Sequence, residues 1–455
     1  MIYWFLGIFN IKKVDRDPNS QTISQSSYSM INDSENSKKA FLNLVNQLIS
    51  DKDFSNLKKL TLVIPTYKRN YYLSRCLWYH AHFPFGQIIV ADSSPEEKKV
   101  INRETVEEVQ KNFGIDILYL EYQPETDKYG GDIYRKWHDA VGYSNTEYVQ
   151  ICTDKEFAIP TQLNTSIEFL ESNPDYISSQ GDEYGVLKLK EPTHSLTLFN
   201  RHPSRSNEPS PDARERLEHS VIHCAGFANS TLLSVMRTTV AKEIYNTYYD
   251  SNRKRNHDLR YGELFLAYGG YVLGKVHHDK KSVSRIRDEI GKYDDIKSNN
   301  GEFFCNSQDS STTRYPTYND YRRLGTIDLY YSSIYDSFCD LYQRNTSFSR
   351  EDVEEHLKTL ESKFKTVFTT EDAFLKKLWD KYNHIYFLLP IFIRKHLSHI
   401  MKPIIKREIP ISKDSPNIIC INEGDLSADE RIIVEIIMLT DKMRQSDSVV
   451  FSTYE

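Results

Sequence analysis

Two carboxylates separated by one residue follow a short apolar run. The run Tyr148–Cys152 reads YVQIC, and Asp154 and Glu156 follow it closely. In an extended segment, side chains at positions i and i+2 point to the same side. Two carboxylates on one side suit a hard divalent cation, Mg²⁺ or Mn²⁺, which can also bind the oxygens of a diphosphate. The alternative is a strand that ends in a solvated acidic turn.

Two further apolar runs also end in polar residues. Leu60–Pro65 is followed by Thr66–Arg69, and Gln87–Ala91 is followed by Asp92–Ser94. Unbroken apolar runs of this length are typical of strands buried on both faces. The pattern also predicts a strand at 115–121 and helices at 71–82, 96–113 and 132–142. This alternation predicts an α/β protein with a doubly wound parallel sheet.

The polar ends of these runs are expected to meet. In a parallel sheet the carboxyl ends of the strands share one edge, and ligands bind just beyond it. Residues 66–69, 92–94 and 154–156 should therefore line one cleft. The sequence thus predicts a ligand site that is built from three strand ends.

The ordered set of segments resembles the nucleotide-binding half of GT-A glycosyltransferases of the family-2 type. The segments that carry the resemblance are TLVIPTYKR, IIVADSS, YRKWHDAV and YVQICTDKEF. More narrowly, they resemble a bacterial subgroup whose fourth strand ends in a C-A-D-D-D-F-like motif. The resemblance covers about residues 58–290 and implies a GT-A fold, with a doubly wound mixed sheet. It also implies an enzyme that moves a sugar from a nucleotide-sugar donor, with UDP as the expected nucleotide.

The resemblance implies roles for the residues that would hold the nucleotide. The turn from Pro65 to Arg69 would hold the donor, with Thr66 and Tyr67 near the base and Arg69 near the ribose or phosphates. Asp92 would accept hydrogen bonds from the base or ribose. Asp92 can instead cap the helix that follows it, because the sequence Asp-Ser-Ser-Pro is favourable at a helix N-terminus.

Further basic residues are expected on the base or phosphate side of the donor. The resemblance places Arg135, on the helix before the fourth strand, beside the base or the diphosphate. The segment Val283–Glu289 resembles one that closes over the donor phosphates, where Arg285 or Arg287 would bind.

The resemblance makes Asp154 and Glu156 the first and last acids of a D-x-D motif that holds Mn²⁺ or Mg²⁺ and the diphosphate. The chain departs from the subgroup at Lys155, where a further acid is usual. A positive charge at this position lowers the expected affinity for a metal ion, and Lys155 could itself pair with phosphate.

Acceptor activation needs a carboxylate that takes the proton of the attacking hydroxyl. In the resembling enzymes this base lies about a dozen residues before a G-Y-K-I-like strand, and Gly274-Lys275-Val276 is similar to that strand. Counting back favours Glu263 as the base, with Asp258 as second choice. Asp182 is expected to face the acceptor pocket. Direct displacement by the acceptor inverts the anomeric centre.

Composition excludes several classes of protein. A net charge of -6 over 455 residues argues against a general nucleic-acid binder. Six widely spaced cysteines without a C-x-x-C pair indicate reduced thiols and a cytoplasmic protein, with neither a disulfide framework nor a zinc site. The apolar start of the chain, residues 1–9, is too short to span a bilayer.

Three regions are expected along the chain. Residues 1–57 hold an N-terminal segment, a polar linker and a short helix, 58–300 form the GT-A domain, and 301–455 are helical. Within the last region, residues 386–407 are apolar and basic. They suit either a buried helix or peripheral contact with the inner face of a membrane, where lipid-linked acceptors are found.

The expected activity is therefore metal-assisted, inverting glycosyl transfer to a glycan, lipid-linked or protein acceptor, as in polysaccharide biosynthesis. One alternative is a sugar nucleotidylyltransferase, although those enzymes place a glycine-rich loop where this chain has Thr66–Arg69. A second alternative is a non-catalytic GT-A-like module that binds nucleotide or serves as a scaffold.

Overall fold

The computed structural model describes the central sheet, the helices around it and three C-terminal helices. The described residues are 34–127, 133–188, 196–200, 207–223, 231–252, 265–289, 327–369, 420–421 and 426–445. Asp258, Glu263 and the segment 386–407 lie outside these ranges, so the expectations about them stay predictions. Within these ranges, no helix combines the length and the apolar character needed to cross a membrane.

The predicted parallel strands form one half of the central sheet. β1 (Leu60–Thr66) lies between β2 (Gln87–Asp92) and β4 (Tyr148–Ile151), and β3 (Ile117–Glu121) lies beyond β2. All three pairings are parallel. The predicted α/β class and these four strands are therefore confirmed.

The other half makes the sheet mixed. β8 (Val235–Arg237) is antiparallel to β4 and to β6 (Tyr176–Lys188), and β7 (Leu196–Asn200) is antiparallel to β6. β9 (Lys275–Asp288) runs parallel to β6, and its end pairs with the short β5 (Glu156–Ala158). β10 (Cys420–Ile421) adds to β7 at the edge. This is the doubly wound mixed sheet that the GT-A resemblance implied.

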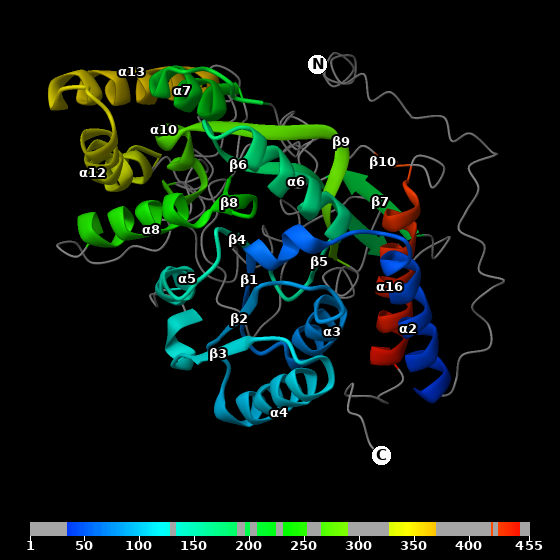
Figure 1. Ribbon diagram of the computed structural model, residues 1–455. Coiled ribbons are helices and arrows are strands. Elements are labelled where there is room, and N and C mark those ends of the chain that lie inside the picture. The colour runs from blue at the N-terminus through cyan, green and yellow to red at the C-terminus, as the bar shows by residue number, and fades with distance from the viewer. Residues whose placement is uncertain are drawn as a thin grey trace, which may run out of the picture.

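Helices cover both faces of the sheet (Figure 1). Within β1, Leu62 and Ile64 belong to one apolar cluster and Val63 to another, and all three are fully buried. The first cluster includes residues of α3 (Asn70–His80), α4 (Glu96–Phe113) and α6 (Pro160–Ser172). The second includes residues of α5 (Ile133–Gly142) and α8 (Thr238–Asn252). Burial on both faces explains the unbroken apolar runs.

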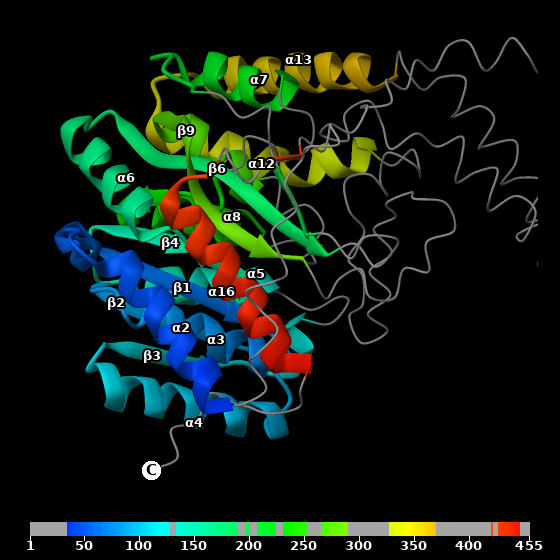
Figure 2. The ribbon, with the colours of Figure 1, turned by 90° about the vertical axis from the view of Figure 1, so that its right-hand side faces the viewer.

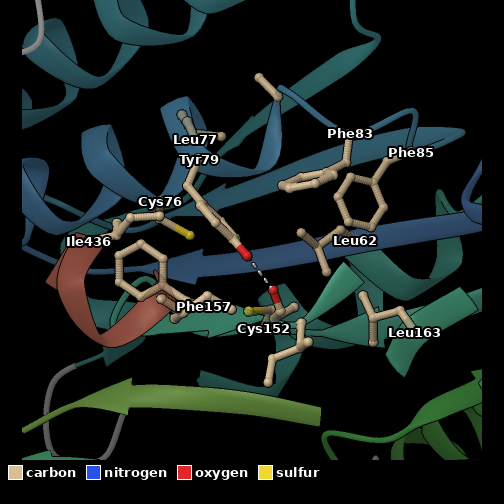
Figure 3. Packing of buried hydrophobic residues seen from close by; sticks show 14 of the residues in the cluster. Leu62, Cys76, Leu77, Tyr79, Phe83, Phe85, Cys152, Phe157, Leu163 and Ile436 are labelled. Carbon is tan, nitrogen blue, oxygen red and sulfur yellow. Dashed lines mark hydrogen bonds between the residues drawn. The ribbon is translucent and has the colours of Figure 1, made fainter. Parts of the chain in front are cut away.

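Aromatic side chains fix α3 against the segment that carries the predicted acids (Figure 3). The Tyr79 hydroxyl donates a 2.9 Å hydrogen bond to the carbonyl oxygen of Ala158. The Tyr79 ring meets that of Phe157 edge-on at a centroid distance of 5.0 Å, and it also packs against Phe83. These contacts hold the C-terminal turn of α3 against β5, which begins at Glu156.

Two helices from opposite ends of the described chain lie side by side (Figure 2). They are α2 (Ser34–Ile49) and α16 (Ala428–Gln445), and both contribute to the same apolar cluster as α3. Ser427 and Glu430 form a capping box at the start of α16, since each side chain binds the other's backbone N–H. These helices therefore pack in the same layer as α3, beside the parallel half of the sheet.

The remaining helices belong to the second apolar cluster, with α5 and α8. α7 (Ala213–His223), α10 (Gly270–Leu273), α12 (Ile327–Asn345) and α13 (Arg350–Thr369) all contribute to the second cluster. Ser349 and Asp352 form a capping box at the start of α13. Two 3-10 turns, η2 (Ser55–Lys59) and η3 (Pro124–Asp127), complete the described elements.

Candidate functional site

The polar ends of β1, β2 and β4 meet at one edge of the sheet, as predicted. Thr66 is paired with Asp92 in the register of β1 and β2. The Thr66 hydroxyl donates a 2.8 Å hydrogen bond to Oδ2 of Asp154, just after β4. These contacts place three segments that are far apart in sequence within reach of one ligand.

The turn after β1 is held to the turn after β2. Lys68 adopts a φ of 59°, in the left-handed region that few non-glycine residues occupy. Its backbone N–H donates a 2.8 Å hydrogen bond to the hydroxyl of Ser94. This contact compensates part of the conformational cost and fixes the path of the chain between Tyr67 and Arg69.

Asp92 organises the second turn. Its fully buried carboxylate accepts hydrogen bonds from the Ser94 backbone, the Asn102 amide and the Tyr119 hydroxyl, at 2.6–2.7 Å. Burial and the bond to Asp92 raise the pKa of Tyr119. Asp92 thus shapes the loop that leads to α4, while α4 itself starts after Pro95 with no side-chain cap. A contact of Asp92 with a nucleotide stays a prediction.

Lys136 of α5 places its amine against the turn that follows β1. Its amine donates to the Thr66 carbonyl oxygen at 3.1 Å, to the Ser93 hydroxyl at 2.8 Å and to Asp127 at 2.5 Å. The predicted Arg135 is exposed on the same helix. Sequence reasoning missed Lys136 and Asp127. Helical spacing could have indicated Lys136, since it lies three residues after Ile133 and four before the buried Ala140.

Asp154 is nearly fully buried and uses both carboxylate oxygens. Oδ2 accepts the hydrogen bond from Thr66, and Oδ1 lies 3.2 Å from Nη1 of Arg69. The Arg69 side chain keeps 37% of its surface exposed, against 1% for Asp154. Asp154 therefore orients a guanidinium that faces solvent at this edge.

Glu156 does not share an extended segment with Asp154, contrary to the expectation from their spacing. Residues 153–156 form a turn that is closed by a 2.9 Å hydrogen bond from the Glu156 N–H to the Thr153 carbonyl oxygen. Glu156 then begins β5, opposite Arg287 of β9. The i and i+2 argument fails here because it holds only for extended backbone.

The Glu156 carboxylate is completely buried and also uses both oxygens. Oε1 accepts a 3.0 Å hydrogen bond from Nη1 of Arg287, and Oε2 accepts one of 2.9 Å from the Thr153 N–H. Arg287 also lies 3.2 Å from Glu289 and retains 23% exposure. Arg285, by contrast, is buried and bound to Glu183 at 2.5 Å. Arg287 is therefore the better placed of the two arginines for a ligand at this edge.

Lys155 occupies the turn between the two acids. It is half-buried, and its amine lies 4.5 Å from the centre of the Tyr72 ring. Burial, and then the nearby charge of Arg69, lower the pKa of Lys155 to about 8. In the described chain, no carboxylate lies within ion-pair distance of this amine. The Tyr72 ring gives it cation–π support, and the charges of Asp288, Asp154 and Glu289 act on it from further away.

The two predicted metal ligands do not fit a divalent cation in this arrangement. All four of their carboxylate oxygens accept hydrogen bonds or ion pairs, and a guanidinium occupies one oxygen of each acid. Among the residues that the structure describes, no group of three histidine, cysteine, aspartate or glutamate side chains could hold a metal ion. Binding of Mn²⁺ or Mg²⁺ stays a prediction, and the geometry does not favour it.

Asp182 lies on β6, four residues beyond Ser178, which pairs with β8. A β-bulge precedes it, where a Cβ on Gly181 would lie 2.5 Å from the Ser282 carbonyl oxygen. Oδ2 of Asp182 accepts a 2.7 Å hydrogen bond from Asn200, and Oδ1 lies 3.0 Å from Nε2 of His278. The parallel course of β4 and β6 places Asp182 at the same edge as Asp154.

Comparison with known proteins gives only a weak likeness. No protein-family model matches the chain. No curated protein matches it either.

Similar solved structures include S. aureus TarS 1-349 in complex with UDP, at 13% identity and a TM-score of 0.39, which covers 87% of this chain and 94% of that one. TarS 1-349 without a named ligand has 11% identity and a TM-score of 0.38, with coverage of 69% and 72%. TarS 1-349 with UDP-GlcNAc has 13% identity and a TM-score of 0.37, with coverage of 69% and 74%. A likeness this slight says nothing about function.

Proposed function

We propose that this protein is a glycosyltransferase that takes its sugar from a nucleotide-sugar donor, with UDP as the expected nucleotide. The observation that carries the proposal is the junction of the ends of β1, β2 and β4, which is made by the Thr66–Asp92 pairing and the Thr66–Asp154 hydrogen bond. The segments that meet there are the ones that resemble family-2 GT-A enzymes, and they meet where parallel α/β sheets bind ligands.

The donor would lie across the carboxyl ends of β1, β2 and β4. Pro65, Thr66 and Tyr67 would border the base. Arg69 is suited to the ribose or the phosphates, because its guanidinium is oriented by Asp154 and more than a third exposed. Arg287, which is partly exposed beside Glu156, would reach the far side of the diphosphate.

Transfer would proceed by a single displacement. The acceptor hydroxyl attacks the anomeric carbon, the bond from that carbon to the diphosphate oxygen breaks, and the configuration inverts. The hydroxyl proton passes to a carboxylate, with Glu263 as first choice and Asp258 as second. Asp182 is the proposed contact for the acceptor, which is a glycan or a glycoconjugate.

A donor-turnover assay tests this proposal. The full chain is incubated with UDP-, GDP- and dTDP-sugars, with and without glycan acceptors, and released nucleoside diphosphate is measured. We expect one nucleotide class to be turned over, with a loss of about tenfold or more in Asp154→Asn, because that change weakens the hold on Arg69. The matched control is Asp116→Asn, an exposed carboxylate ahead of β3.

Two outcomes contradict the proposal. Nucleotide binding without any release would favour the non-catalytic GT-A-like module. Release of pyrophosphate from a nucleoside triphosphate and a sugar phosphate would instead indicate a nucleotidylyltransferase.

A further inference from the structure

We infer that the diphosphate of the donor is bound by protein cations, chiefly Lys155 and Arg69, in place of a divalent metal ion. The inference rests on the proposed use of a nucleotide sugar. It names the groups that neutralise the leaving diphosphate, and it predicts that donor binding is independent of metal.

The acidic residues at this edge of the sheet lie in the protein interior. Asp154, Glu156, Asp288 and Glu289 are all buried, with between 0 and 3% of their surface exposed. A divalent cation needs carboxylate oxygens that point toward the ligand. Here these acids lie beneath the surface of the site.

Arginine side chains already form ion pairs with these acids. Arg69 binds Asp154, and Arg287 binds both Glu156 and Glu289. Arg75 is fully buried and binds Asp288 at 2.6 Å. A metal ion at Asp154 or Glu156 would compete with the guanidinium bound to that acid, and loss of the ion pair would leave the arginine without its partner.

The cations, in contrast with the acids, are partly exposed to solvent. Arg69 and Arg287 keep 37% and 23% of their side-chain surface exposed, and Lys155 is half-buried. Lys155 has no ion-pair partner in the described part of the chain, and the charges of Arg69 and of the buried acids around the site act on it in opposite directions. At this edge, acids therefore form the floor of the site and cations form its accessible surface.

This arrangement suits a diphosphate. Arginine presents paired N–H donors to phosphate oxygens, and lysine acts on them as a compact positive charge. Two neighbouring cations repel each other until an anion lies between them. As the bond from the anomeric carbon to the diphosphate breaks, negative charge grows on the leaving oxygen. Fixed cations stabilise that charge as a metal ion would.

Calorimetric titration of the full chain with UDP, GDP and dTDP tests the inference. Each titration is done in EDTA and again with Mn²⁺. We expect one nucleotide to bind with a Kd that differs by no more than about twofold between the two conditions. Lys155→Met should raise that Kd about tenfold, as the loss of one charge-assisted phosphate contact would, and Lys155→Arg should restore most of the affinity.

Lys111→Met is the matched control, because Lys111 is exposed at the end of α4, and it should leave the Kd unchanged. Thermal unfolding of each variant identifies any that fails to fold, and Lys155→Arg then decides the case. Binding that requires Mn²⁺, or an unchanged Kd in a folded Lys155→Met, would overturn the inference and leave the proposed function standing. If no nucleotide binds under either condition, both are wrong.

Discussion

The hydroxyl of Thr66 donates a 2.8 Å hydrogen bond to the carboxylate of Asp154, although the two residues are 88 positions apart. Both side chains are almost completely buried. The bond joins the end of β1 to the turn after β4. It also holds Asp154 in place to bind Arg69, so one buried contact supports the accessible guanidinium of the candidate donor site.

Removal of this hydrogen bond should destabilise the protein. Thr66→Val keeps the shape of the side chain but leaves one oxygen of a buried carboxylate without its donor. We expect the free energy of unfolding to fall by about 1–3 kcal/mol, measured by urea denaturation. Thr165→Val on the exposed face of α6 is the control and should change it by less than about 0.5 kcal/mol. Equal effects of the two substitutions would show that the buried bond contributes nothing.

The buried pair of Arg75 and Asp288 should be sensitive to the loss of one partner. Arg75 also donates to the Thr440 hydroxyl of α16, so it links α3, β9 and the C-terminal helix. Arg75→Met leaves Asp288 buried without its cation, and we expect a loss of about 3–5 kcal/mol in the free energy of unfolding.

Asp288→Asn in the Arg75→Met background should recover part of that loss, because no charge then remains unpaired. A double-mutant cycle measures this coupling. The control is Arg350→Met, which breaks the solvent-exposed pair with Glu354 and should change stability little. Strictly additive effects of the two core substitutions would contradict the interpretation of Arg75 and Asp288 as a coupled pair.

His80 should make stability depend on pH. Its Nδ1–H donates to the Cys76 carbonyl oxygen at 2.8 Å, and Nε2 accepts the Ala158 N–H at 3.3 Å, so the folded protein holds the neutral ring. Burial lowers the pKa of His80 from 6.5 to about 4. Between these values the unfolded chain binds a proton that the folded chain does not, so stability falls as the pH drops from 6.5 toward 4.

The contribution of His80 between pH 7 and pH 4.5 is expected to be roughly 2 kcal/mol. It is measured as the difference in urea unfolding between those pH values, for the wild type and for His80→Gln. The variant should lose less stability on acidification, since it has no titrating ring at this position. Parallel pH profiles would show that His80 is protonated equally in the folded and unfolded chains.

The docking of α16 should be essential to the stability of the parallel half of the sheet. Ile436 of α16 lies in the same apolar cluster as Leu62, Cys76 and Phe157 (Figure 3). Ile436→Ala should lower the free energy of unfolding by about 2–5 kcal/mol, because it leaves a cavity in a packed core. Arg431→Ala, at an exposed position of the same helix, is the control and should cost less than about 0.5 kcal/mol. A small effect of Ile436→Ala would indicate that α16 is dispensable.

Local sequence patterns were sufficient for much of the fold. The unbroken apolar runs predicted β1, β2 and β4, and helical spacing predicted α4 over 96–113, the range that the structure has. The polar strand ends also predicted the meeting of Thr66, Asp92 and Asp154. These features depend on periodicity and on the geometry of parallel sheets, both of which can be inferred from short stretches of sequence.

The chemistry of the site was decided by tertiary contacts. The sequence suggested that Asp154 and Glu156 point together toward a metal ion, but a turn separates them and Arg287, 131 positions away, pairs with Glu156. Likewise, the face of α5 that packs against β1 determines that Lys136, and not Arg135, contacts the turn after β1. Residue spacing describes neighbours along the chain. The partner of a buried charge depends instead on which strand, distant in sequence, packs beside it. That long-range pairing made acids the floor of this site and cations its surface.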